Sequence, residues 1–305
     1  MKDGFLFIDK EIDWTSRDVC NKASHILNNK KVGHSGTLDP FATGLLIVAL
    51  GSATKIIPYL EDMDKTYVAE LTLGKKTSTG DLTGEVILEK DIPSLTKEFI
   101  KEKMNGFLGD IEQVPPMTSA IHVNGKKLYE LAHKGIEIER KSRKVHIHEL
   151  SLLNFEDDKI LFSCKVSKGT YIRTLGEDIA EALGTVGHLT ALRRVKIHEY
   201  NVNDACKIES VSEEKLIPIE KFLSSIMEIV FVDAEIERKI KNGVTFSKET
   251  FPAIKSKNVL FVSKETNETL AIYEADMQNY KCQRGLWNHG KIPKRNRRIP
   301  DSDNK

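Results

Sequence analysis

Short apolar runs separated by polar loops characterise the N-terminal part of the chain. The run at residues 5–8 ends in charged residues and predicts a buried strand. A helix is expected over residues 15–28, because a threonine and a serine can cap its start and apolar residues recur on one face. The run at 45–50 is short and bounded by glycines, which favours a fully buried strand. A short helix begins at Ser52, and the alternating pattern at 67–73 predicts another strand.

From residue 96 onward, amphipathic helices are mixed with paired strands. Helical spacing predicts helices at about 96–109 and 172–184, each ending at a glycine. Two alternating runs, 144–153 and 159–166, flank an acidic turn and predict a hairpin. Residues 188–199 indicate a further strand. This mixture predicts an α+β fold with a mixed, mainly antiparallel sheet and flanking helices.

Near residue 229 the pattern changes to short strands and turns. Runs that predict strands occur at 229–232, 259–262 and 269–273. We therefore expect a large domain at 1–228 and a small β-rich domain at 229–290. The end, 291–305, holds six Lys and Arg and predicts a disordered basic tail.

The composition excludes disordered and fibrous proteins. The chain has 305 residues, of which 40% are hydrophobic and 30% charged, which is too apolar for a disordered chain. Its net charge of +1 means that a nucleic-acid-binding surface must be a local patch. Between His122 and His148, seven Lys or Arg stand against three Glu. A solvated face is the simplest interpretation of this run, and a binding surface is the alternative.

The sequence predicts neither a membrane segment nor a metal site. The longest apolar run has six residues, whereas a membrane span needs roughly 20. The start carries an early acid, Asp3, and lacks the pattern of a signal peptide. The four cysteines show no CxxC or Cys/His ligand spacing, which indicates reduced thiols. We expect a soluble, cytoplasmic monomer without metal or other cofactor.

One segment concentrates glycines and a proline around an aspartate. Residues 33–46 read Gly-His-Ser-Gly-Thr-Leu-Asp-Pro-Phe-Ala-Thr-Gly-Leu-Leu and deliver Asp39 just before a buried strand. Loops held by a rigid scaffold often carry functional residues. A turn aspartate before a proline more often caps local structure, so spacing alone leaves both interpretations open.

The whole segment closely resembles the GxLDPxATGxL motif of the tRNA pseudouridine synthase B family. Further matches follow in order over about residues 1–200. They are Gly4-Phe5-Leu6-Phe7-Ile8-Asp9-Lys10, Lys65-Thr66-Tyr67, Leu73-Gly74, Thr79-Gly80-Asp81, Gly84-Glu85-Val86, Lys168-Gly169-Thr170-Tyr171-Ile172-Arg173-Thr174-Leu175 and Leu192-Arg193-Arg194. The resemblance implies the pseudouridine synthase fold, a PUA-like module at 229–290, and an isomerase that converts uridine 55 in the tRNA T-loop to pseudouridine.

The resemblance assigns the chemistry to three side chains. Asp39 would act as nucleophile or base on a flipped-out uridine, whose N-glycosidic bond is broken and remade as a carbon–carbon bond. Arg173 would hold this carboxylate and keep it ionised. Tyr67 would stack on the uracil and relay a proton. Without the resemblance, Arg173 is equally well a surface residue, and Tyr67 is sheet filler.

The same resemblance assigns other residues to RNA binding. His34 would fill the stack that the extruded base leaves, and Tyr171 and Leu192 would line the base pocket. The basic insertion at about 115–148 lies where the family grips RNA. The remaining expected RNA contacts are Lys10, Lys126, Lys127 and Arg143.

Two departures from the family pattern concern RNA binding. Glu11 stands where the family usually has a proline after the lysine. Residues 115–122 lack the tyrosine and the lysine of the family's PPxYSAxK pattern. The contacts of the insertion are therefore in question, whereas the catalytic assignment is unaffected.

Rival functions remain open at this point. A guide-RNA-dependent homologue shares GHSGTLDP but matches less well at 42–46 and 65–86, so we expect tRNA, bound through its T-arm, as the partner and no guide RNA. A non-catalytic RNA-binding or RNA-folding protein would keep the fold without the chemistry. A carboxylate-dependent nucleoside hydrolase would release free uracil.

Overall fold

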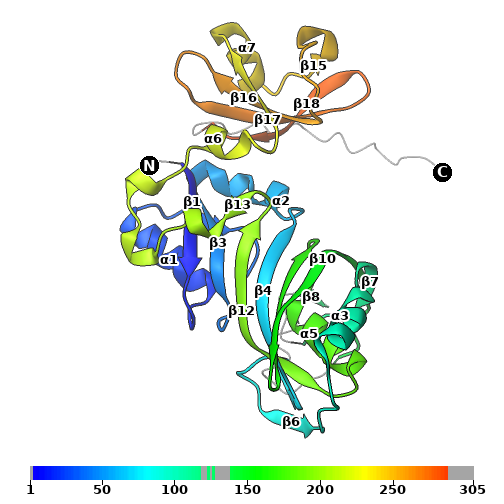
Figure 1. Ribbon diagram of the computed structural model, residues 1–305. Coiled ribbons are helices and arrows are strands. Elements are labelled where there is room, and N and C mark those ends of the chain that lie inside the picture. The colour runs from blue at the N-terminus through cyan, green and yellow to red at the C-terminus, as the bar shows by residue number, and fades with distance from the viewer. Residues whose placement is uncertain (1–2, 118–121, 124–125, 128–137, 288–305) are drawn as a thin grey trace, which may run out of the picture.

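Among the residues that the computed structural model describes (3–117, 122–123, 126–127 and 138–287), nine strands form one central sheet. Their order is β1-β3-β12-β4-β11-β10-β7, with β2 beside β3 and β13 beside β12 (Figure 1). The strands are β1 (Gly4–Lys10), β2 (Val32–His34), β3 (Thr43–Leu50), β4 (Lys65–Leu73), β7 (Gly109–Gln113), β10 (Arg143–Glu156), β11 (Lys159–Val166), β12 (Gly187–Ile197) and β13 (Tyr200–Asn201). Within this sheet β3 and β12 pair in parallel and the other neighbours antiparallel. The predicted mixed, mainly antiparallel sheet is confirmed.

Helices cover the sheet differently on its two halves. On the β4–β10 half, α3 (Lys97–Asn105) and α5 (Ile172–Ala182) pack against one face and bury the largest apolar cluster. On the β1–β3 half, α1 (Ser16–Ile26) covers one face. The opposite face is covered by the 3-10 helix η1 (Gly51–Lys55), α2 (Ile57–Leu60) and α6 (Ile219–Leu223).

The helix ends follow local chemistry. Thr15 and Asp18 form a capping box at the start of α1, since each side chain accepts a hydrogen bond from the other's backbone N–H. The helix predicted to reach Gly109 ends earlier, at Asn105. Gly109 instead adopts φ +91° and turns the chain into β7, a strand that the apolar pattern did not indicate.

Two hairpins extend from the sheet. One joins β5 (Lys75–Thr77) to β6 (Val86–Glu89). The other, in the basic insertion, pairs β8 (His122–Val123) with β9 (Lys126–Lys127). Residues 118–121, 124–125 and 128–137 of the insertion lie outside the described residues.

The chain after β13 returns along β1. It runs through the 3-10 helices η2 (Val202–Asp204), η3 (Ile208–Ser210) and η4 (Glu213–Lys215) before α6. Isolated bridges join Ile8 to Cys206 and Phe5 to Ile217 on the way. The returning segment therefore pairs with the outer edge of β1.

The C-terminal part is a second sheet with one added helix. Its five strands follow the order β14-β16-β17-β18-β15. They are β14 (Glu228–Val232), β15 (Phe246–Ser247), β16 (Asn258–Ser263), β17 (Thr269–Ala275) and β18 (Asn279–Gly285). The β-rich character is confirmed, but α7 (Ala234–Lys241) and the 3-10 helix η5 (Lys248–Thr250) were not expected. Because α7 is rich in charged residues and buries only Ile240, its sequence gives only a weak indication of a helix.

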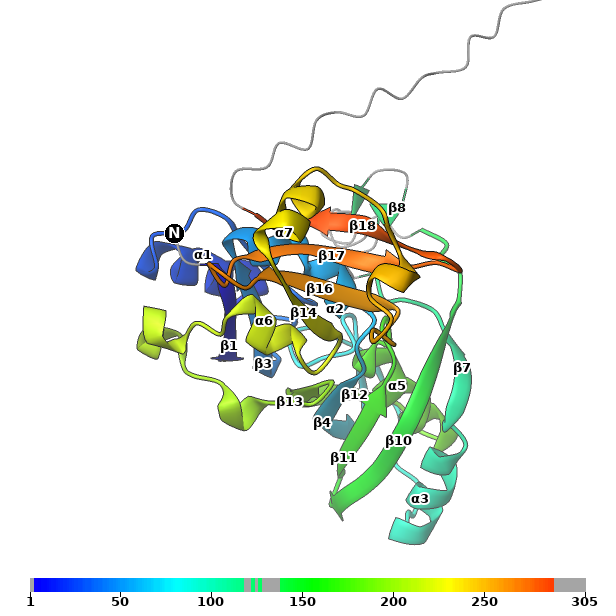
Figure 2. The same ribbon diagram turned by 90° about the horizontal axis from the view of Figure 1, so that it is seen from above.

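Apolar contacts join the two sheets. Figures 1 and 2 show the C-terminal sheet lying against α6 and the end of β1. Phe5 stacks on Phe222 with ring centroids 3.9 Å apart, and the same cluster includes Leu260 and Ile272 of the second sheet. The ammonium of Lys55 also donates to the carbonyl oxygen of Gly285 at 2.7 Å.

Within the described ranges, no helix combines the length and apolarity needed to cross a bilayer.

Candidate active site

The loop that carries Asp39 joins β2 to β3 and is anchored on both sides of the aspartate. The hydroxyl of Ser16 accepts from the backbone N–H of Leu38 at 2.9 Å. The backbone N–H of Asp13 donates to the carbonyl oxygen of Pro40 at 2.9 Å. The segment around α1 thus fixes the residues directly before and after Asp39.

A buried arginine ties the same loop to the sheet. Gly44 has φ +106°, and a Cβ there would lie 2.3 Å from the carbonyl oxygen of Arg194, so only glycine allows this close parallel pairing. The guanidinium of Arg194 donates to the carbonyl oxygens of Leu45 and Gly36 at 2.8 and 3.2 Å. Strand β12 therefore positions both ends of the loop.

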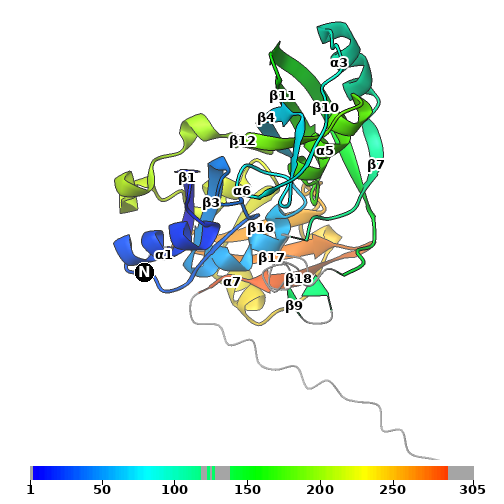
Figure 3. The same ribbon diagram turned by 90° about the horizontal axis from the view of Figure 1, so that it is seen from below.

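Arg173 brings two carboxylates together at the start of α5. Its Nε lies 3.0 Å from Oδ2 of Asp39, and its Nη1 lies 3.4 Å from Oδ2 of Asp81. Nη1 also donates to the carbonyl oxygen of Thr79 at 3.0 Å. Figure 3 shows α5 beside β4 and β12, two strands in the middle of the sheet order. One guanidinium thus links the loop before β3 to the hairpin of β5 and β6.

The surroundings make Asp39 an unusual aspartate. Burial raises its pKa above the ordinary value, Arg173 and Lys10 lower it, and the Asp81 carboxylate raises it. The net direction is upward, so Arg173 offsets the cost of burial only in part. The Asp39 side chain is nevertheless 32% exposed, whereas those of Arg173 and Asp81 are 6% and 5% exposed. A carboxylate with a raised pKa that solvent still reaches is suited to act as a base.

Tyr67 and Leu192 lie in the same apolar cluster as the Asp39 loop. Tyr67 on β4 pairs in register with Arg194 on β12, and only 8% of it is exposed. Burial raises the pKa of the Tyr67 phenol, Arg194 lowers it, and the Asp39 carboxylate raises it slightly further. Leu192 is buried on β12 beside them. The structure therefore gathers Asp39, Arg173, Tyr67 and Leu192 around one centre.

The other expected contacts are more dispersed. His34 ends β2, half-buried, and burial followed by the charges of Arg17 and Arg194 lowers its pKa. Tyr171 is half-buried and directly precedes α5. Arg143 is exposed at the start of β10. Lys126 and Lys127 form β9, and their side chains lie outside the described residues.

Lys10, which we expected to contact RNA, lies in the interior of the protein. It is 1% exposed. Its ammonium donates to the carbonyl oxygens of Trp14, Glu11 and Pro40 at 2.7, 2.9 and 3.2 Å. Burial lowers the pKa of Lys10 to about 8, although the Asp39 carboxylate opposes this shift. Lys10 thus holds the Asp39 loop from within.

Replacing Lys10 by Met should destabilise the protein without changing the electrostatics of RNA binding. Three carbonyl oxygens would lose their donor, at a cost of about 1–3 kcal/mol. The slope of log Kd for tRNA against log salt concentration should stay unchanged, and denaturant unfolding should give the stability loss. A slope that falls by the amount typical of one neutralised phosphate would instead support a direct contact between Lys10 and RNA.

The unexpected acid Glu11 has a cationic partner. Its Oε1 lies 3.0 Å from Nζ of Lys207, which also lies 3.3 Å from Asp9. Arg193 completes the group with a two-pronged contact to Asp9, at 2.9 and 3.1 Å. Lys207 therefore neutralises the negative charge of Glu11, the residue that stands where the family usually has a proline.

Comparison with known families decides the classification. Residues 24–172 match the family described as TruB family pseudouridylate synthase (N terminal domain). Residues 173–230 match the family described as tRNA pseudouridylate synthase B C-terminal domain. The chain belongs to the TruB family. The two TruB matches meet between Ile172 and Arg173, at the start of the helix whose Arg173 contacts Asp39.

Curated TruB relatives match over nearly the whole chain. A tRNA pseudouridine synthase B from Staphylococcus haemolyticus is 41% identical over 288 residues, covering 90% of this chain and 94% of its own. One from Clostridium kluyveri is 42% identical, covering 88% and 94%. One from Listeria welshimeri is 38% identical, covering 95% and 97%. The chain is therefore of the same enzyme family as these isomerases.

Solved structures share the fold. A chain from the crystal structure of a Cbf5-Nop10-Gar1 complex superposes with a TM-score of 0.69 at 23% identity, covering 95% of this chain and 87% of its own. A chain from the structure of an H/ACA RNP bound to a substrate RNA containing 2'-deoxyuridine gives 0.68 at 22% identity, with the same coverage. At this identity the likeness supports the TruB fold alone.

Sequence reasoning missed two charged residues that shape the surroundings of Asp39. Asp81 was part of a recognised motif but received no role, and only the fold shows that it reaches Arg173. Arg194 was likewise part of a motif, and its burial at 1% exposure is the signal that it supports the loop. A charged residue within a motif that otherwise lies in a buried strand could have indicated Arg194, whereas Asp81 lies in the turn between β5 and β6.

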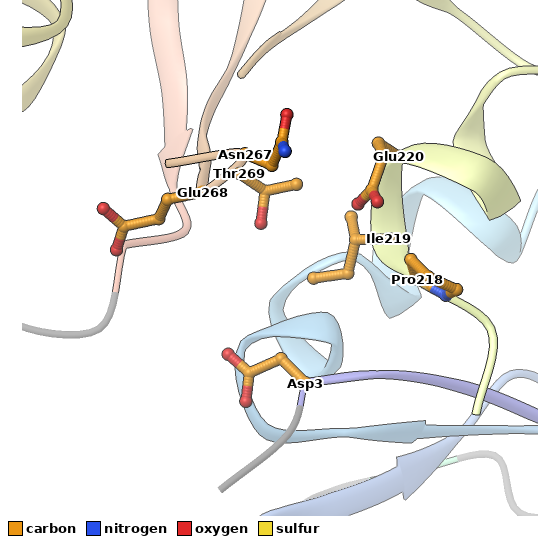
Figure 4. Close-up of a pocket in the computed structure, with 7 residues that line it drawn as sticks. All are labelled: Asp3, Pro218, Ile219, Glu220, Asn267, Glu268 and Thr269. Atoms are coloured by element: carbon orange, nitrogen blue, oxygen red, sulfur yellow. The ribbon is translucent and has the colours of Figure 1, made fainter. Parts of the chain in front are cut away.

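Other regions of the described chain offer weaker candidates for a functional site. Within these residues, no three His, Cys, Asp or Glu side chains are grouped to hold a metal ion. An open depression lies at the junction of the two sheets (Figure 4). It is lined by Asp3, Pro218, Ile219, Glu220, Asn267, Glu268 and Thr269. With three carboxylates around it, this depression does not suit an anionic RNA.

Proposed function

We propose that this chain converts uridine 55 in the tRNA T-loop to pseudouridine, with Asp39 as the reacting carboxylate. The observation that carries the proposal is the contact between Asp39 and Arg173, at 3.0 Å, in a chain of the TruB family. The curated relatives are named tRNA pseudouridine synthase B, which supports tRNA as the substrate. The T-loop position follows from the resemblance of residues 33–46 to that family's motif.

The reaction balances without a donor or redox partner. The bond between N1 of uracil and C1′ of ribose breaks, and a bond between C5 and C1′ forms. C5 loses its hydrogen as a proton, and a nitrogen of the rotated base is protonated. Asp39 acts as nucleophile or base toward the nucleotide, and Tyr67 packs against the uracil and is placed to relay the proton.

RNA binding must supply the energy that flips the base. Extruding a nucleotide costs a few kcal/mol, which pocket contacts and phosphate neutralisation offset. His34 takes the place of the extruded base, while Tyr171 and Leu192 line its pocket. The basic insertion, with Lys126, Lys127 and Arg143, contacts the T-arm backbone. We expect the protein to act as a cytoplasmic monomer without a guide RNA.

Mapping pseudouridine in cellular tRNA tests this proposal. Cells without the gene should lack pseudouridine at position 55, and a plasmid copy should restore it. A plasmid carrying Asp39→Asn should not. Full modification in the deletion strain, or restoration by the Asn variant, would refute the proposed activity and favour an RNA-binding or RNA-folding role.

Removing positive charge from the insertion should weaken tRNA binding in a salt-dependent way. Lys141, Arg143 and Lys144 are exposed at its base. Changing all three to Gln should raise Kd and flatten the slope of log Kd against log salt by about 0.7–0.9 for each phosphate that the variant no longer neutralises. Arg238→Gln with Lys239→Gln, on α7, serves as the control for loss of surface charge elsewhere. An unchanged slope in the triple variant would place the RNA surface elsewhere.

A further inference from the structure

Gln113 has an unusual environment for an amide side chain. It is the last residue of β7 and is only 1% exposed. Its Oε1 accepts from the backbone N–H of Tyr171 at 3.0 Å. Its Nε2 donates to the carbonyl oxygen of the same residue at 3.3 Å. One side chain therefore holds both backbone polar groups of a single residue 58 positions away.

The residue that Gln113 holds is the N-cap of α5. The carbonyl oxygen of Tyr171 also accepts the first helical hydrogen bond, from the N–H of Leu175 at 3.0 Å. The Tyr171 side chain makes no capping hydrogen bond of its own. Since Arg173 follows two residues later, Gln113 fixes the helix end from which the guanidinium reaches Asp39.

Gln113 also lies at the base of the basic insertion. It pairs in register with Arg143 on β10, at the point where the chain enters and leaves the insertion. The carbonyl oxygen of Pro115, two residues beyond it, accepts from Nη1 of Arg140 at 3.1 Å. The strand pair that carries the insertion is thus linked directly to the first turn of α5.

We infer that Gln113 is a positioning residue that holds Arg173 against Asp39 through the backbone of Tyr171. This role rests on the proposed function, because it concerns the geometry of that reaction. Burying an amide is favourable only when both its polar atoms are bonded, and Tyr171 satisfies both. A shift of about 1 Å at a reacting group can lower a rate 100-fold. The linkage also ties β7 and β10, the two strands that flank the insertion, to the helix end that carries Arg173.

The test replaces Gln113 by Met, which keeps the length and loses both hydrogen bonds. Under saturating enzyme, the single-turnover rate of pseudouridine formation should fall about 10- to 100-fold, while Kd for tRNA changes less than about threefold. The acid limb of the pH–rate profile should move to higher pH. Arg173 lowers the pKa of Asp39, and a looser Arg173 lowers it less. Asp81 and Lys10 also act on Asp39, and the variant leaves both unchanged.

Thr185→Val is the matched control. Thr185 is 1% exposed just beyond the other end of α5, and its hydroxyl donates to the carbonyl oxygen of Lys90 at 3.2 Å. Thr185→Val should lower the stability of the protein by a comparable amount and leave the single-turnover rate and the pH–rate profile unchanged. If Gln113→Met does not fold, Gln113→Asn, whose shorter amide cannot reach both backbone groups of Tyr171, should give a fall of the same kind. A wild-type rate and profile in the Gln113 variant refutes the positioning role, whereas an inactive wild type refutes the proposed function itself.

Discussion

Asp39→Asn is expected to abolish pseudouridine formation while leaving tRNA binding nearly intact. The amide has the shape of the carboxylate but neither its charge nor its basicity, so it cannot serve as nucleophile or base. Loss of such a group lowers turnover by a factor of roughly 10⁴ or more. The measurement is single-turnover conversion with purified enzyme and a tRNA transcript, together with Kd by filter binding.

The stability of the variant provides the internal control. Burial raises the pKa of Asp39, so removing its charge relieves a desolvation cost even as it weakens the contact with Arg173. The Asn variant should therefore unfold close to the wild-type midpoint. Pseudouridine formation at more than about 1% of the wild-type rate would contradict the assignment.

Arg173→Met is expected to make activity and stability change in opposite directions as pH rises. Without the guanidinium, Asp39 and Asp81 face each other with less positive charge, and the pKa of Asp39 rises further above its ordinary value. Turnover at pH 7 should fall roughly 10²- to 10³-fold, and part of the loss should be recovered as pH rises and Asp39 ionises.

The stability of the Arg173→Met variant should fall as pH rises, whereas its activity should recover. A carboxyl group with a raised pKa in the folded state binds more protons there than in the unfolded chain, so stability falls as pH rises through that pKa. The loss, about 3–5 kcal/mol at neutral pH for breaking a buried ionic group, should shrink in acid. Arg173→Lys, which keeps the positive charge, should lose less activity and less stability than Arg173→Met. Parallel pH dependence of activity and stability would contradict this electrostatic role.

Local pattern was sufficient to predict the strands and helices around the site. The apolar run at 45–50 and the alternation at 67–73 correspond to β3 and β4, because burial on one or both faces fixes the side-chain period. Strand β7 could not be found this way, since its pattern is half exposed and its pairing with β10 is a tertiary property. Helix α7 was missed because its sequence is dominated by charge.

The site was predictable only as far as the motifs reached. Spacing left Asp39 ambiguous, and the resemblance selected it, but its contact with Arg173 depends on two segments 134 positions apart in sequence meeting over the sheet. For Lys10 the resemblance suggested a contact with RNA, yet the fold surrounds its ammonium with carbonyl oxygens. The role of Gln113 is visible only in three dimensions.

The most direct test of the central claim follows the hydrogen on C5. A T-arm transcript labelled with tritium at C5 of its uridines should release one equivalent of tritium to water per RNA, from position 55 alone, with the uracil still attached to the RNA. The Asn variant at position 39 should release none. Free uracil among the products, or release that is independent of Asp39, would contradict an isomerisation carried by this carboxylate.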